Sequence, residues 1–356
     1  MTVSATEKKT GSLYIKSFNG SSVALEEIPV LSEGDFNRLI LSSVSKGLRV
    51  SSYFGVAEND SKALKLYVVL ADDTENSLKI SSTEIHAKEF LSLTPQCPQV
   101  HLFEREIAEQ FGVKPVNHPW LKPVRYNQCR TSDQSLMHSF LGAVEDFYKI
   151  EGEQVHEVAV GPVHAGIIEP GHFRFQCHGE EVFHLEIALG YQHRGIERAL
   201  QGEFGKRSLH YAENIAGDSA IGHGSSLCQI VESLSDSQQS ARALAIRGIA
   251  LELERVANHV GDLGALSGDV GFLPTASFCG RIRGDFLNMT AVLCGNRFGR
   301  GLLKAGGVRF DLQQPHIDDL LRRLDAAEKD VSVAVNLLWD TPSVMARFEN
   351  TGTLTT

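Results

Sequence analysis

The segment Glu213-Asn-Ile-Ala-Gly-Asp-Ser-Ala-Ile-Gly-His223 has the form of a metal-binding loop whose metal ligands are absent. A helix-opening loop of the pattern Glu-Arg-Val-Cys-Gly-Ile-Cys-x-x-x-His offers two thiolates to a soft transition metal. Here the two cysteine positions hold Ala216 and Ser219, while Glu213, Gly217 and His223 keep the frame. A methyl group binds no metal, and a neutral hydroxyl is a poor substitute for a thiolate. The segment therefore predicts the frame of such a loop without its metal chemistry.

A small sheet is predicted before this loop in the chain, and helices are predicted after it. Strands are expected at 155–160, 172–177 and 182–188, around Gly161-Pro162. The longest helix is expected at about 238–267, and at least one more at 312–338. An apolar stripe at alternating steps of four and three residues should place the long helix against a core: Ile249, Leu253, Val256, Val260 and Leu263.

The first part of the chain has an α+β pattern. A helix is predicted at 32–45, with Ser32 or Glu33 near its cap, and another at 104–111, ending at Gly112. Short β-rich runs occupy 50–56 and 64–71. Residues 1–10 are expected to be a disordered tail, residues 11–130 a domain, residues 131–151 a helical connector and residues 152–356 a second domain.

Composition restricts the class of protein. A net charge of −10 argues against nucleic-acid binding, which needs a basic face. No apolar run is long enough to span a bilayer, and the N-terminus lacks the apolar core of a signal peptide. The six cysteines form no CxxC pair, which supports neither a zinc ribbon nor a self-contained iron–sulfur site.

Two groups of ionisable residues are candidates for chemistry. Glu252, Arg255, His259 and Asp262 recur at helical spacing beside the apolar stripe of the long helix, so they form either a buried interface or a solvated face. The loop 161–174 places His164, Glu169, His172 and Arg174 between glycines and a proline. Burial would raise the proton affinity of Glu169, as a proton relay requires, whereas a solvated turn is the structural alternative.

A third group lies in the run Gly190–Arg198, where Arg194 and Glu197 either fix a helix start or bind an anion, and which also contains His193. Nine of the 14 histidines fall between His156 and His259, but no HxH, HxxxH or HExxH pattern supports a metal site among them. A zinc hydrolase is therefore only a remote alternative. The chain also lacks a GxGxxG motif opening a βαβ unit, a P-loop and a GxSxG motif.

Together these motifs resemble a known family. Gly161–Arg174, Gly190–Arg198, Glu213–His223, Leu251–Gly264 and Lys304–Asp311 are similar, in this order, to motifs of the catalytic subunit of group-4 NiFe hydrogenases. That family is homologous to the 49-kDa quinone-pocket subunit of respiratory complex I. The run from Phe103 to Gly112 and the triplet Asn117-His-Pro119 resemble the complex I 30-kDa subunit. Fusion of the two modules is characteristic of the formate hydrogenlyase and hydrogenase-4 type large subunit.

The resemblance implies an α+β fold. An N-terminal α/β domain like the 30-kDa subunit would precede a mainly helical domain like a hydrogenase large subunit, with a small β-sheet. The chain stops at Thr356, before the region that carries the second thiolate pair in hydrogenases, so this second domain is expected to be C-terminally short. With Ala216 and Ser219 at the first pair, the resemblance predicts no metal and no NiFe centre on this chain.

The resemblance also implies roles for individual residues. Glu169 matches a proton-transferring glutamate, Asp269 an aspartate of the quinone pocket, and Arg255 with His259 a pair beside the pocket and the partner's cluster. His164 would join Glu169 and Asp269 as a catalytic, proton-handling residue. Five further residues are expected to face the pocket or the cluster: His172, Arg174, His193, Arg194 and His223.

The predicted function is that of a subunit in a membrane-associated oxidoreductase. Electrons would come from a 4Fe–4S cluster in an iron–sulfur small subunit of the complex I 20-kDa type and pass to quinone or another small acceptor. NADH would be oxidised on another subunit. Antiporter-like membrane-arm subunits are the expected further partners, with a peripheral location at the cytoplasmic face of the inner membrane. The alternative is a non-catalytic connector that docks the cluster subunit onto the membrane arm.

Overall fold

The computed structural model describes residues 12–57, 63–124, 147–164, 170–202 and 204–353. The chain divides into two compact units, one ending at His193 and one beginning at Arg194. The domain ranges expected from the sequence instead follow the two family modules, and they stay a prediction. The expected tail at 1–10 and residues 131–146 of the expected connector lie outside the described residues. Residues 147–151 are described and are not helical, so the predicted connector helix does not extend to residue 151.

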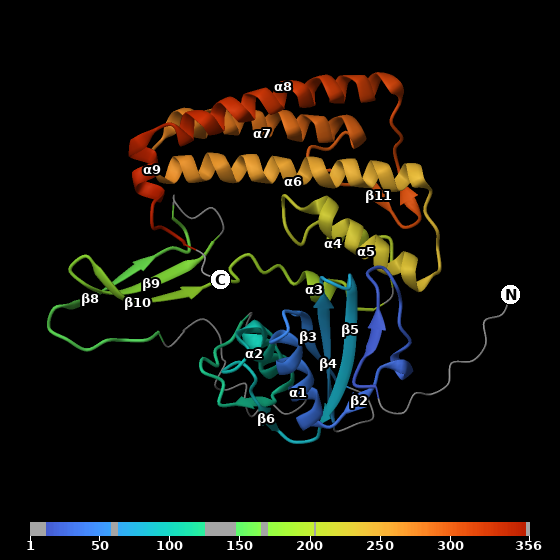
Figure 1. Ribbon diagram of the computed structural model, residues 1–356, viewed down its shortest axis with the longest axis vertical. Coiled ribbons are helices and arrows are strands. Elements are labelled where there is room, and N and C mark those ends of the chain that lie inside the picture. The colour runs from blue at the N-terminus through green and yellow to red at the C-terminus, as the bar shows by residue number, and fades with distance from the viewer. Residues whose placement is uncertain (1–11, 58–62, 125–146, 165–169, 203, 354–356) are drawn as a thin grey trace. The chain divides into compact units, whose positions relative to one another are not determined.

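The first unit begins with an α/β domain. Its elements are β1 (Ile15–Ser17), a 3-10 turn (Leu25–Glu27), β2 (Val30–Leu31), α1 (Glu33–Val44), β3 (Arg49–Ala57), β4 (Leu64–Asp72), β5 (Ser77–Ile85), β6 (Glu89–Leu91), a 3-10 turn (Pro98–Val100), α2 (His101–Phe111) and β7 (Lys114–Val116). The main sheet has the order β1-β5-β4-β3, with β2 parallel to β5. Helices α1 and α2 lie against this sheet (Figure 1).

The cap and core of this domain follow the predicted pattern. The Ser32 hydroxyl accepts a hydrogen bond from the Asp35 N–H at 3.2 Å and so caps α1. Phe36 and Ile40 of α1 and Val68 of β4 are fully buried in one apolar cluster. Helix α2 begins three residues before the predicted start and ends at Gly112, whose φ of 67° is the left-handed conformation that a helix C-terminus favours.

Helix α2 fixes the chain segment that leaves this domain. Arg105 donates hydrogen bonds to the carbonyl oxygens of Lys122 at 2.6 Å and Pro123 at 2.8 Å. Glu109 accepts one from the Val124 N–H at 2.8 Å. The buried Glu104 accepts hydrogen bonds from three groups of residues 92–94. The charged residues of the 103–112 motif therefore serve to position the backbone around the helix.

A three-stranded antiparallel sheet completes the first unit: β8 (Val155–Val160), β9 (His172–His178) and β10 (Glu181–Ala188). All three strands were predicted within one or two residues. Because side chains alternate between the two faces of a strand, the paired residues Arg174 and Glu186 lie on the opposite face from Leu185. The Glu186 carboxylate, only 2 % exposed, forms an ion pair with the Lys122 ammonium. This ion pair connects the sheet to the segment that α2 holds.

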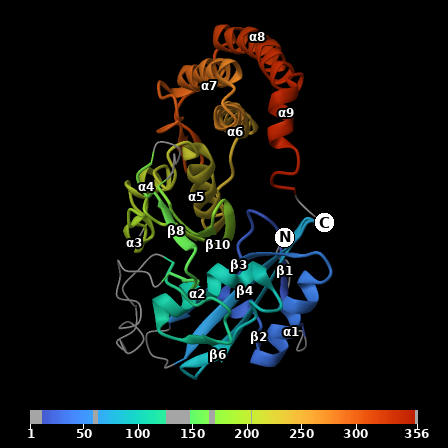
Figure 2. The same cartoon turned by 90° about the vertical axis from the view of Figure 1, so that its left-hand side faces the viewer.

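The second unit is mainly helical. Its elements are α3 (Ile196–Ala199), α4 (Ser208–Ala212), α5 (Ala220–Leu234), α6 (Ala241–Asp269), α7 (Leu273–Cys294), β11 (Leu303–Lys304), β12 (Gly307–Val308), α8 (Gln314–Trp339) and α9 (Pro342–Phe348). The long helices α6, α7 and α8 lie side by side (Figures 1 and 2). Among the helices of the described ranges, none has the length and apolarity needed to cross a bilayer.

The apolar stripe of α6 was predicted well, with one exception. Leu253 and Val260 are buried, and Val256 and Leu263 pack against the core cluster of this unit. Ile249 is 42 % exposed, so its assignment to the core was wrong. The buried face of α6 instead includes small residues such as Ala250.

A buried ion pair ties three segments of the second unit together. The Arg247 guanidinium of α6 binds both carboxylate oxygens of Glu232 on α5, at 3.0 and 2.6 Å. Arg247 also donates to the carbonyl oxygens of Lys304, at 2.7 Å, and Gly307, at 2.8 Å, while Glu232 accepts the Gly306 N–H at 2.7 Å. The hairpin β11–β12, which contains the glycines of the 304–311 motif, is thereby fastened to both helices.

We expect Arg247→Met to destabilise the helical unit strongly. Removing one partner of a buried ion pair leaves an uncompensated charge, at a cost of about 3–5 kcal/mol. The measurement is the denaturant midpoint followed by helical circular dichroism. Arg255→Met on the same helix is the matched control, because Arg255 pairs with Glu252 on an exposed surface and contributes little. Equal shifts for the two variants would contradict the structural role of Arg247.

Candidate functional site

The candidate site is built around the loop that joins α4 to α5. Ala216 and Ser219, at the two positions of the missing thiolates, are both partly buried. Ser219 is the residue before the first turn of α5, and its hydroxyl makes no capping hydrogen bond. Within the described residues, no group of three or more His, Cys, Asp or Glu side chains is placed to hold a metal ion. A methyl and a hydroxyl in this position do not fit a nickel–iron centre.

The cysteines electrostatically coupled to this loop do not replace the missing ligands. Cys228 of α5 and Cys294 at the end of α7 both interact with the charge of Glu213. Burial raises the pKa of each thiol, which keeps both cysteines protonated. Metal ligation requires the thiolate, so these two side chains are suited to packing.

The start of the loop is anchored by a buried carboxylate. Glu213, whose side chain is 3 % exposed, accepts a hydrogen bond from the Gly301 N–H at 2.8 Å. Its other oxygen lies 3.3 Å from His210 Nδ1. Arg194 binds the carbonyl oxygens of Asn214 and Ile215, the latter at 3.1 Å. The loop start is therefore held by protein groups on both sides.

The middle of the loop is held by α6 and α7. The Asn258 side-chain amide donates to the Asp218 carbonyl oxygen at 3.0 Å, and Arg283 lies 3.2 Å from the Asp218 carboxylate. His223 Nδ1 lies 2.9 Å from the Ser219 carbonyl oxygen, within the first turn of α5. The histidine of the loop frame thus contacts the backbone at one of the lost ligand positions.

Glu254 of α6 binds the start of α5 directly. Its two carboxylate oxygens accept the N–H groups of Ile221 at 2.7 Å and Gly222 at 3.0 Å. The N-terminal end of a helix favours a negative charge, and its first N–H groups need partners. Burial nevertheless outweighs these contacts and the nearby His223, and it raises the pKa of Glu254, with Asp218 adding to the effect.

Sequence reasoning did not identify Glu254 as a site residue. It lies inside the 251–264 motif, directly before Arg255, but its partners are 32 and 33 residues away. The signal available was the position of a carboxylate next to the buried Leu253 on an amphipathic helix. Glu232 and Arg247 were missed for the same reason, since their contacts are made across segments.

The site residues predicted in the first unit lie on or near the small sheet. His172 and Arg174 both belong to β9; His172 Nδ1 lies 3.1 Å from the Gly161 carbonyl oxygen, and Arg174 forms an ion pair with Glu157. His164 and His193 are exposed. The remaining predicted residue of this unit, Glu169, lies outside the described residues.

His172 and Arg174 each carry a buried nitrogen atom that has no hydrogen-bond partner in the described part of the chain. His172 Nε2 and Arg174 Nε are buried and make no hydrogen bond among the described residues. Arg174 also covers the Phe147 ring, at 4.5 Å from its centroid. These two side chains are therefore held in place by the contacts of their other atoms.

The site residues predicted in the second unit fall into two places. Arg194 and His223 lie at the loop itself, and Arg255 and His259 lie on α6 on either side of Asn258, which contacts the loop. Arg255 and His259 are exposed on this chain. Asp269 is the last residue of α6 and exposed, about 15 Å further along the helix than His259 at 1.5 Å per residue. The second unit by itself does not bring Asp269 to the loop.

Two protein families match separate parts of the chain. The family described as respiratory-chain NADH dehydrogenase, 30 Kd subunit, matches residues 36–129, and the 49 Kd subunit family matches residues 269–356. The chain is thus similar to the 30 Kd subunit family in its first part and to the 49 Kd subunit family in its last part.

The chain is also similar to components of a hydrogenase, a formate hydrogenlyase and an NADH-quinone oxidoreductase. It is 30 % identical over 281 residues to hydrogenase-4 component G of Escherichia coli, covering 75 % of this chain and 51 % of the relative. Formate hydrogenlyase subunit 5 of the same organism is 28 % identical, with coverage of 75 % and 49 %. An NADH-quinone oxidoreductase subunit of Campylobacter jejuni is 27 % identical, with coverage of 56 % and 48 %. The chain spans about half the length of these relatives, to which it is homologous.

One solved structure shares the fold. A chain from the structure of the membrane-bound sulfane sulfur reductase, an archaeal respiratory membrane complex, superimposes with a TM-score of 0.53 at 20 % identity. The match covers 58 % of this chain and 55 % of that chain. At this level of identity the likeness describes the fold alone.

We expect Glu254→Gln to alter how stability depends on pH. Because the folded pKa of Glu254 is raised above its ordinary 4.5, the folded state binds a proton more tightly than the unfolded state. Its contribution is therefore full below pH 4.5 and is lost as pH rises through the folded pKa. The variant should lack this loss, so its unfolding free energy relative to wild type should rise with pH. Denaturant titrations at several pH values measure the difference.

Glu252→Gln is the control for this experiment. Glu252 lies two residues away on α6, and its hydrogen bond to Arg255 lowers its pKa. The unfolding free energy of Glu252→Gln relative to wild type should therefore fall as pH rises. If the unfolding free energies of Glu254→Gln and wild type change with pH in parallel, the assigned environment of Glu254 is wrong.

Proposed function

We propose that this chain is a peripheral subunit of a membrane-associated, complex I-like or hydrogenase-4-like oxidoreductase complex. In this proposal it has no nickel–iron centre. It accepts electrons from a 4Fe–4S cluster in an iron–sulfur partner of the 20-kDa type and passes them to quinone or another small acceptor. The complex would also contain antiporter-like membrane-arm subunits, with this chain at the cytoplasmic face of the inner membrane.

The observation that carries the proposal is the structure of the 213–223 loop. Glu213 and Glu254 hold it through hydrogen bonds to protein backbone, while Ala216 and Ser219 occupy the thiolate positions. The loop keeps its protein contacts although the residues do not suit the metal. The names of two similar proteins, hydrogenase-4 component G and an NADH-quinone oxidoreductase, support a redox complex as the setting.

The proposed chemistry requires protons as well as electrons. Reducing a quinone to a quinol consumes two electrons and two protons. The electrons would arrive singly from the partner's cluster, near Arg255 and His259. Glu169, His164 and Asp269 would deliver the protons, since carboxyl and imidazole groups are the side chains that most often transfer protons in enzymes.

A structural connector is the second candidate function. The observation favouring it is that Arg255 and Asp269 are exposed, and that Arg255 is engaged in an ion pair with Glu252. In a connector these charges would only dock the cluster subunit onto the membrane arm, and no pocket would need to be complete.

We expect Glu169→Gln and Asp269→Asn to lower quinone reduction by the assembled complex by about tenfold or more, the lower end of what a proton-transferring side chain contributes. The measurement is the rate with a short-chain quinone. Asp325→Asn is the control, because Asp325 is an exposed carboxylate in the middle of α8. Unchanged rates in both site variants would favour the connector.

We expect no stoichiometric nickel on this chain in the purified complex. A methyl and a hydroxyl supply none of the thiolates that nickel binds at these two positions. Metal analysis by mass spectrometry is the direct measurement, with a nickel hydrogenase prepared in parallel as the positive control. One nickel atom per chain would overturn the statement.

A further inference from the structure

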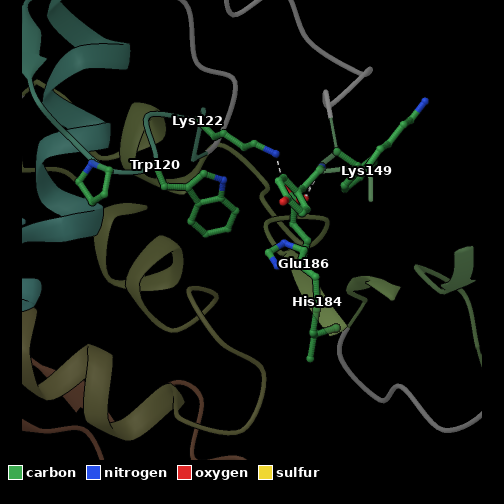
Figure 3. Close-up of a pocket in the computed structure, with 9 residues that line it drawn as sticks. Trp120, Lys122, Lys149, His184 and Glu186 are labelled. Carbon is green, nitrogen blue, oxygen red and sulfur yellow. Dashed lines mark hydrogen bonds and ion pairs between the residues drawn. The ribbon is translucent and has the colours of Figure 1, made fainter. Parts of the chain in front are cut away.

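A cavity of about 690 Å³ lies in the first unit, between the segment fixed by α2 and strand β10. This volume is in the range of about 300–1,000 Å³ that small-molecule sites occupy. Figure 3 shows Trp120 on one side of the cavity and His184 with Glu186 on the other. Nothing in the proposed redox function uses this cavity, which makes it independent of the loop in the second unit.

The aromatic wall of the cavity is held in place by its neighbours. The Trp120 ring stacks on His101 at a centroid distance of 5.9 Å and an angle of 12°. The Arg105 guanidinium lies 4.9 Å from the centre of the same ring. Opposite, Tyr148 packs against His184 at 4.6 Å. Rings fixed in this way favour stacking with a flat ligand, because little side-chain freedom is lost on binding.

The charges inside the cavity are already paired. Glu186 accepts the Tyr148 N–H at 2.9 Å and forms the ion pair with Lys122. The Lys122 ammonium also lies 5.5 Å from the centre of the Trp120 ring. Among the described lining residues, the interior thus offers a flat ligand apolar surface and no uncompensated carboxylate that would attract a cation.

One cation remains at the rim. Lys149 lines the cavity and is exposed, its side chain extends outward in Figure 3, and it forms no ion pair among the described residues. A single ammonium that has no ion pair within the described ranges suits a ligand with one negative charge. It does not suit a nucleoside polyphosphate, which needs several cations or a glycine-rich loop.

We propose that this cavity binds a planar aromatic molecule with one anionic group: the ring system lies between Trp120 and the Tyr148–His184 pair, and the anion reaches Lys149. The site is formed where the segment following the 30-kDa-like domain meets the sheet, so it requires both parts of the first unit.

The test uses the full chain and two probes of the same shape, 2-naphthoate and its neutral counterpart 2-naphthamide. The chain has two tryptophans, so Trp339→Phe assigns the indole N–H signal of Trp120 in a nitrogen-15 NMR spectrum. We expect both probes to shift the Trp120 signal saturably and to leave the Trp339 signal of the unmodified chain in place. Naphthoate should bind about two- to fivefold more tightly, the effect of one exposed ion pair.

Lys149→Gln should abolish the preference for naphthoate and leave the affinity for naphthamide unchanged. Lys46→Gln, at an exposed lysine of the same unit outside the cavity, should keep the preference. Both lysines are exposed, so we expect both substitutions to leave the fold unchanged. The proposal is overturned if neither probe shifts Trp120 at millimolar concentration, if Trp120 and Trp339 shift alike, or if Lys149→Gln keeps the preference for naphthoate.

Discussion

The second unit depends on one buried ion pair, Glu232 with Arg247. Two charges taken out of water are costly unless every hydrogen-bonding position is used, and here both carboxylate oxygens and the guanidinium are engaged. The arginine pulls the Glu232 pKa down against the upward effect of burial, so the pair remains ionised. Because the hairpin β11–β12 bonds to both members, the relative positions of α5, α6 and the hairpin are set at one point.

This geometry supports the loop at the start of α5. Glu254 lies two helical turns along α6 from Arg247 and binds the first N–H groups of α5, while Glu232 holds the last turn of the same helix. Helix α5 is therefore attached to α6 at both ends by carboxylates. The two attachments differ in their proton affinity, since the pKa is lowered for Glu232 and raised for Glu254. The end beside the loop is the one that acid conditions would neutralise first.

Local patterns in the sequence predicted the elements better than the contacts between them. The three strands β8, β9 and β10, the cap at Ser32 and the stripe through Leu253 and Val260 follow from periodicity and capping chemistry. Ile249 was misplaced because the buried line of α6 passes through Ala250 and Leu253, and Ile249 lies at its edge with Val256 and Leu263. The short pairs β6–β7 and β11–β12 were not predicted, because two- or three-residue strands leave no period to read. The roles of Glu254, Glu232 and Lys122 depend on partners 15 to 74 residues away, for which the sequence has no local signal.

The anchoring of the 213–223 loop decides which residues can be used to test its function. Glu213 binds the Gly301 backbone from a buried position, so replacing it would harm folding whether or not the protein catalyses anything. The frame around Ala216 and Ser219 is thus part of the fold of this unit, whatever the loop binds. A substitution at Glu213 would lower activity through the fold and would not distinguish a redox subunit from a connector. The exposed Asp269 can be changed without that cost.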